Sequence, residues 1–139
     1  MLIRKLICCV ALTWASASCL AGQIIHVTPT LPQANQYARL DFDIEIKAKW
    51  KDPFHAKDVS VDLLLTSPSG KQLRLPAFYI DGKPGQPSHW QARFTPQEAG
   101  NYSYNAALSE SGKLQKPSRT GNFSALPSKA KGFLKPDCL

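Results

Sequence analysis

Apolar and polar side chains alternate along several short stretches of this chain. From residue 39 to 48 every second position is apolar, and the positions between them carry three acids and a lysine. A period of two residues over ten positions is typical of a β-strand with one buried face and one wet face. The same alternation recurs over residues 59–65, 90–94 and 102–108. The inward positions of the first stretch are Leu40, Phe42, Ile44, Ile46 and Ala48.

Three shorter stretches, residues 23–28, 72–75 and 121–125, are further strand candidates. Turn-forming residues, chiefly glycine, proline, serine and asparagine, gather between the stretches, and no window of a dozen residues has a helical stripe. We therefore expect an all-β fold, an immunoglobulin- or fibronectin III-like antiparallel β-sandwich of about seven strands.

Residues 1–21 have the layout of a secretory signal peptide. Arg4 and Lys5 precede a short apolar run, and small residues follow as far as Ala21. The run is too short to cross a bilayer, so we expect no membrane span. We place the cleavage after Ala21, with cleavage after Ala17 as the second choice. A lipoprotein anchored through Cys19 is the less favoured alternative.

Cleavage after Ala21 changes the charge and the cysteine content of the chain. Cys138 is then the one cysteine that remains, so no internal disulfide is expected. The role of Cys138 stays open. The net charge falls from +7 to +5 because two basic residues leave. The remaining basic residues are scattered, so we expect no nucleic-acid binding. We expect a periplasmic or secreted protein with the sandwich over residues 22–127 and a linker, or a truncated lead-in to a missing catalytic domain, over residues 128–139.

The charged residues offer two candidate metal sites, and neither is favoured. Asp41, Asp43 and Glu45 share one strand face, but side chains two positions apart lie about 7 Å from each other, too far to converge on one calcium ion. A solvated face whose acids pair across the sheet, with Arg93 as one partner, is the preferred interpretation. The histidines are isolated, so we expect no metal and no cofactor.

Aromatic residues are the best candidates for a binding surface. Trp50, Tyr79 and His89 lie in or beside predicted turns, where aromatic rings can stack on sugar rings or contact a protein partner. Packing at the rim of the core is the alternative for Trp50 and Tyr79. Trp90 is in phase with Phe94 and is expected to face the core.

Residues 93–104 combine an arginine, a carboxylate and two tyrosines. Such side chains occur in polysaccharide-cleaving sites, but no partner acid can be singled out for the paired carboxylates that such a site needs. The alternative is a tyrosine corner, in which Phe94 ends one strand, Gly100 forms the turn and the Tyr102 hydroxyl bonds to the upstream backbone. We prefer the corner and expect no catalytic residue in this chain.

Five motifs in the chain resemble one known module. They are KDPF at 51–54, TSPSGK at 66–71, LPAFY at 75–79, WQARFTP at 90–96 and GNYSY at 100–104. This set is similar to the immunoglobulin-like domain of unknown function found N-terminal to TIM-barrel glycoside hydrolases and apiosidase-like proteins. The resemblance covers roughly residues 36 to 126. Asp52 stands where the family usually has asparagine, and residues 83–88 form an insertion.

The resemblance implies a function and carries over no catalytic residue, because the barrel that would hold the catalytic acids is missing. It implies a non-catalytic accessory module of an exported carbohydrate-active enzyme that packs against or positions a catalytic TIM barrel. The chain is then a truncated or split gene product. The alternative is a stand-alone periplasmic β-sandwich that binds a polysaccharide or a protein.

Overall fold

The computed structural model describes residues 21–130, and this part of the chain is built from strands and turns without a helix. No segment of it could cross a membrane as a helix. Residues 1–20 of the predicted signal peptide and Cys138 lie outside the described residues. The strands in order are β1 (Gln23–Pro29), β2 (Gln33–Asn35), β3 (Leu40–Lys47), β4 (Val59–Thr66), β5 (Gln72–Pro76), β6 (Phe78–Gly82), β7 (Pro87–Phe94), β8 (Gly100–Glu110), β9 (Lys113–Leu114) and β10 (Gly121–Leu126).

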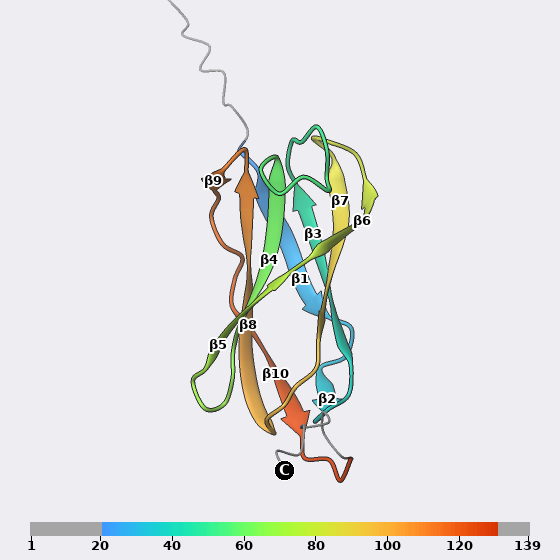
Figure 1. Ribbon diagram of the computed structural model, residues 1–139, viewed down its shortest axis with the longest axis vertical. Coiled ribbons are helices and arrows are strands. Elements are labelled where there is room, and N and C mark those ends of the chain that lie inside the picture. Colours follow the sequence, from blue (N-terminus) through green and yellow to red (C-terminus); the bar gives the residue numbers. More distant parts are fainter. Residues whose placement is uncertain (1–20, 131–139) are drawn as a thin grey trace, which may run out of the picture.

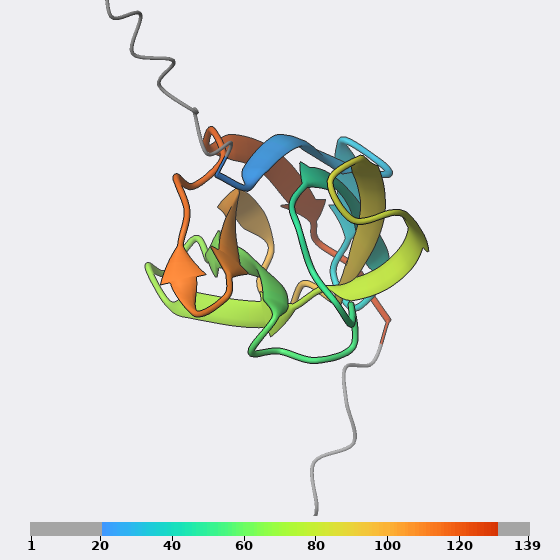
Figure 2. The same cartoon turned by 90° about the horizontal axis from the view of Figure 1, so that it is seen from above.

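The strands form two sheets that pack face to face (Figures 1 and 2). The first sheet has the order β1-β3-β7-β6, and the second has the order β2-β10-β8-β4-β5, with β9 paired to β8. These orders match the ABED sheet and the GFC sheet with an added C′ strand of immunoglobulin domains. The predicted fold class is therefore confirmed. The pairs are antiparallel except β2 with β10, which is parallel.

The described residues contain ten strands instead of the expected seven or so. The three additional strands are β2, β6 and β9, which span three, five and two residues. β6 follows β5 after the single residue Ala77 and carries the chain diagonally from the second sheet to the first (Figure 1). The Ala77 amide donates to the carbonyl of Val61 over 2.8 Å, which anchors this crossing to β4.

The alternating positions predicted to face inward form the core. Leu40, Phe42, Ile44 and Ile46 of β3 are each at most 1% exposed, and Trp90 of β7 is 3% exposed as expected. The Phe42 ring meets Tyr104 and Phe123 of the second sheet edge-on, with centroids 5.1 and 5.5 Å apart. Such edge-to-face pairs add to the stabilisation from burial and hold the two sheets together.

The β7–β8 connection forms the contact expected of a tyrosine corner. The buried Tyr102 hydroxyl donates to the carbonyl of Glu98 and accepts from the Glu98 amide, each over 3.1 Å. The Tyr102 ring stacks on Phe123 and meets Phe94 edge-on, with centroids 5.0 and 5.4 Å apart. Burial raises the pKa of the Tyr102 hydroxyl above its usual range. The residue thus fixes the turn to both sheets.

Gly100 and Glu98 tie this corner to the β4–β5 turn. Gly100 has a φ of 132°, and a β-carbon there would lie 2.8 Å from Pro68 Cγ. Glycine is required because its conformation and its close approach both exclude a side chain. The Ser69 hydroxyl donates to Glu98 Oε1 over 2.9 Å, and the Ser69 amide donates to Glu98 Oε2 over 3.2 Å. The carboxylate of residues 93–104 is thus held by a neighbouring turn, in keeping with the corner that the sequence analysis preferred.

Candidate functional site

An aromatic cluster lies beneath the loop between β3 and β4. Trp50 meets Trp90 and Tyr79 edge-on, with centroid distances of 6.2 and 6.3 Å. Trp50 is only 9% exposed, so it belongs to the core and offers no open ring face. It is therefore not the exposed platform that the sequence suggested. Tyr79 is half-buried, and its hydroxyl donates to the carbonyl of Gly82 over 2.6 Å.

Phe54 is the aromatic residue that this loop presents to solvent. Its side chain is 80% exposed, and its ring meets the half-buried Tyr79 edge-on at 5.7 Å. The Phe54 amide donates to Asp52 Oδ1 over 2.9 Å, and the His55 amide donates to the Asp52 carbonyl over 3.2 Å. This Asx-type turn holds the ring outward. Sequence reasoning did not select Phe54, although the Asp52–Pro53 turn signal directly precedes it.

A hollow of about 310 Å³ opens beside Phe54. Its walls come from the β3–β4 loop, β4 and the β5–β6 crossing, and they include Pro53, Phe54, Pro76, Phe78 and Tyr79. These apolar walls beside an exposed ring could accept the apolar face of a sugar ring or a partner's side chain. We call this hollow, with Phe54, the aromatic end.

His89 does not line the aromatic end. It lies on the outer face of β7, 58% exposed, with its Nε2 atom 4.0 Å from Asp81 Oδ1. On β3, Glu45 is its cross-strand neighbour, and Glu45 Oε2 lies 3.0 Å from Nδ1 of His26 on β1. The structure thus brings Trp50 and Tyr79 together and leaves His89 in a separate row of polar side chains with Glu45 and Asp81.

The remaining acids of β3 pair with neighbouring cations and amides. Arg39 Nε donates to Asp41 Oδ1 over 2.9 Å, and this hydrogen bond holds the pKa of the Asp41 carboxyl below its usual range. Arg93 lies opposite Asp41 on β7, with its Nε atom 3.8 Å from Asp41 Oδ1. Gln91 donates to Asp43 over 3.2 Å. Between residues 21 and 130, no three potential ligand side chains gather around a metal position.

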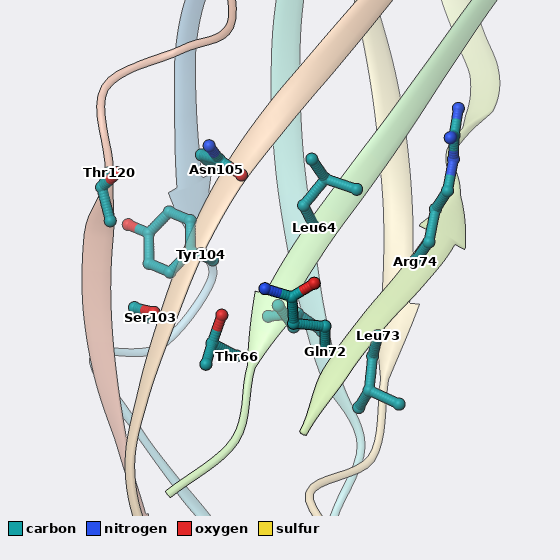
Figure 3. A pocket seen from close by; sticks show the side chains of 10 residues that line it. Leu64, Thr66, Gln72, Leu73, Arg74, Ser103, Tyr104, Asn105 and Thr120 are labelled. Carbon is teal, nitrogen blue, oxygen red and sulfur yellow. The ribbon is translucent and has the colours of Figure 1, made fainter. Parts of the chain in front are cut away.

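The outer face of the second sheet carries neutral polar side chains. A hollow of about 440 Å³ opens there. Figure 3 shows the side chains that line it, among them Thr66 from β4, Gln72 from β5, and Ser103 and Asn105 from β8. Leu64 is partly covered within it. At one side Arg74 Nε donates to Asp62 over 3.1 Å, which leaves this arginine engaged. The hollow offers hydrogen bonds and lacks an exposed aromatic ring for stacking.

A second apolar surface lies at the end opposite the β3–β4 loop, where β2 and the last residues of β10 run together (Figure 1). Leu31 and Leu126 are 55% and 43% exposed. Two backbone hydrogen bonds connect the segment around β2 to β10. The Gln36 amide donates to the Leu126 carbonyl over 2.8 Å, and the Ser124 amide donates to the Pro32 carbonyl over 3.4 Å. We call this surface the exit end, because the chain leaves β10 there. Neither leucine belongs to an alternating stretch that would have marked it in the sequence.

Tyr37 makes the exit end rigid. Its φ of 67° lies in the left-handed region, which is unusual for a residue with a bulky side chain. The Tyr37 amide donates to the Pro96 carbonyl over 2.8 Å. Gln36 Nε2 donates to the Tyr37 hydroxyl and to the Gln97 carbonyl, over 3.1 and 2.7 Å. These contacts tie the loop before β3 to the β7–β8 corner.

Comparison with known proteins places the chain in one sequence family. The family model described as "Domain of unknown function (DUF5060)" matches residues 33–109, more than half of the chain. No curated protein sequence matches the chain. A solved structure of Pseudomonas fluorescens alkylpurine DNA glycosylase AlkC, bound to DNA containing an abasic site analog, is similar with a TM-score of 0.49 and 12% identity. The similarity covers 76% of this chain and 30% of that one, and at this level it carries no inference about function.

Proposed function

This chain belongs to the DUF5060 family, and from that premise we propose that it is a non-catalytic accessory module of an exported carbohydrate-active enzyme. In this role it packs against a catalytic barrel and positions it. The arrangement of the exit end is the observation that carries the proposal.

The exit end has the properties of a contact surface for a domain that follows in sequence. Leu126 exposes apolar area at the point where the chain leaves β10, and Leu31 exposes more in the β1–β2 connection before β2. Apolar area that a neighbouring domain covers contributes about 25 cal/mol per Å² to association. The bonded loop around Tyr37 adds rigidity, so little conformational freedom is lost when the surface is covered.

A binding experiment with matched variants tests this role. The DNA immediately downstream is sequenced first, and a reading frame for a barrel is expected there. Association of the exported chain with that barrel is then measured by calorimetry. Leu31→Asp combined with Leu126→Asp is expected to weaken it at least tenfold, whereas Leu114→Asp, at a more exposed leucine of β9, is expected to have no effect. Absence of a barrel frame, or equal binding by all variants, would overturn the proposal.

A second function, binding of a polysaccharide by the chain itself, is favoured by the aromatic end. Phe54 stands exposed over Tyr79 beside a hollow with apolar walls, which is the arrangement needed for stacking on a sugar ring. Glycan-array binding that is lost on Phe54→Ala and retained on Leu114→Ala would support it. Binding that survives Phe54→Ala would exclude the aromatic end as the glycan site.

A further inference from the structure

Gly22, the residue before β1, is buried against the end of β8. A β-carbon on Gly22 would lie 2.3 Å from Glu110 Oε2 and 3.2 Å from both the Ala48 β-carbon and Leu108 Cδ2. With the carboxylate in place, only a residue without a side chain fits. β1 and β8 belong to different sheets, and the start of one meets the end of the other at the upper end of Figure 1. The contact therefore bridges the sandwich.

Glu110, whose side chain is partly buried, brings an unpartnered carboxylate oxygen to this contact. Its Oε2 atom is buried, and among residues 21–130 no hydrogen-bond partner reaches it. The side chains of Ala48 and Leu108 around Gly22 cannot supply a donor. A buried carboxylate oxygen without a donor or a cation is costly, and folded proteins generally pair such groups. This position therefore calls for a positive group or a strong donor.

The backbone nitrogen of Gly22 can supply a positive group to Glu110. It is bonded to the same carbon as the β-carbon position, and covalent geometry places it within about 5 Å of Glu110 Oε2. As part of a peptide bond, this nitrogen has one N–H and no charge. As a chain terminus, it would be an ammonium group with three donors at neutral pH. A terminal glycine is also free to rotate its amino group toward the carboxylate.

We propose that signal peptidase cleaves between Ala21 and Gly22, and that the new α-ammonium group of Gly22 forms an ion pair with Glu110 that completes the fold. Hydrolysis breaks the Ala21 carbonyl–Gly22 nitrogen bond. Water supplies the hydroxyl that makes Ala21 a carboxylic acid and the hydrogen that makes Gly22 an amine, which then takes up a proton. Removal of the leader and closure of the sandwich are thus coupled in one step.

The alternative processing sites cannot provide this ion pair. Cleavage after Ala17 leaves the Gly22 nitrogen inside a peptide bond, four residues from the terminus. A lipoprotein anchored on Cys19 leaves it inside a peptide bond as well. The unpaired Glu110 oxygen therefore favours cleavage at the Ala21–Gly22 bond. This argument is independent of the pattern of small residues in the leader.

The intact mass of the exported protein is the first test. The full-length precursor is produced in a bacterial host, and the exported form is measured by mass spectrometry. A chain that begins at Gly22 is expected. A chain that begins at Ser18, or at a lipid-modified Cys19, would overturn the proposal.

A double-mutant comparison is the second test. The processed chain is compared with the same chain extended by Ala21 alone, each with and without Glu110→Gln. Extension is expected to lower the melting midpoint by about 5 °C when Glu110 is present, because the ammonium group is lost, and by much less in the Glu110→Gln background. An equal effect of extension in both backgrounds would overturn the ion pair.

The reactivity of the terminal amine is a readout that a purely structural role of Glu110 would not change. An ammonium group held by a carboxylate gives up its proton less readily, so acylation of the Gly22 amine at neutral pH is expected to be several-fold slower in the processed chain than in its Glu110→Gln variant. Equal rates would show that the amine does not contact the carboxylate.

Discussion

Replacing Tyr102 by phenylalanine isolates the hydrogen bonds of the β7–β8 corner. The substitution removes one oxygen that donates to the carbonyl and accepts from the amide of Glu98, each over 3.1 Å. The ring itself keeps its contacts with Phe123 and Phe94. A net intramolecular hydrogen bond contributes about 1 kcal/mol, so the loss of both is expected to cost about 1–2 kcal/mol of unfolding free energy. For a domain of this size, the melting midpoint should fall by about 5–10 °C.

The matched control is the same substitution two residues further along β8. Tyr104 is also largely buried, but its hydroxyl bonds to no other group within residues 21–130, so Tyr104→Phe should change the stability little. Urea unfolding with equal slopes, together with calorimetry, gives both differences under the two-state assumption. If the two variants melt at the same temperature, the corner bonds do not stabilise the fold.

Three further predictions concern stability. Gly100→Ala should destabilise the protein by about 1–3 kcal/mol in urea unfolding, and by more than Gly70→Ala, since both positions have positive φ but only Gly100 has a neighbour in the way of a β-carbon. Burial raises the pKa of the Tyr102 and Tyr104 hydroxyls in the folded state. The stability that they contribute is therefore complete below about pH 10, the pKa of an unfolded tyrosine, and is lost as the pH rises through their raised pKa values. Phenolate absorbance and melting midpoints measured above pH 10 check this. Ser69→Ala removes a hydrogen bond to the Glu98 carboxylate in the β7–β8 turn and should lower the unfolding free energy by about 1 kcal/mol in urea unfolding. An unchanged unfolding free energy would show that other contacts hold the turn.

Strand phase explains how much of the core could be predicted from sequence. Alternation over ten positions assigned the inward residues of β3, and the phase of Phe94 placed Trp90 in the core. The same rule would have placed Trp50 inward, because it continues the even-numbered series from Leu40 two positions beyond Ala48. The nearby turn led us to expect that the Trp50 ring would be exposed. The inward phase of β3 instead continues beyond its last residue, Lys47, and includes Trp50.

The strands that sequence did not predict lack a local signal. β2 has one buried residue, Ala34, and exists through its parallel pairing with β10 far along the chain. β6 has an irregular register between Tyr79 and Asp81, which breaks the alternation that would have marked it. The exposure of Phe54 and the contact between Gly22 and Glu110 depend on loop geometry and on elements distant in sequence. Neither of these two features can be predicted from the local alternation of apolar and polar residues.

The distribution of charge explains why both proposed contact surfaces lie at the ends of the sandwich. On the outer face of the first sheet, Asp41 and Glu45 are already engaged by side chains of neighbouring positions or strands. A partner that covered this face would have to desolvate those pairs, at a cost that their mutual attraction does not fully return. At the exit end and the aromatic end, Leu126 and Phe54 gain from burial, and a partner there need not break any of the ion pairs of the charged face. Association is therefore favoured at the ends, which leaves the charged face in contact with water.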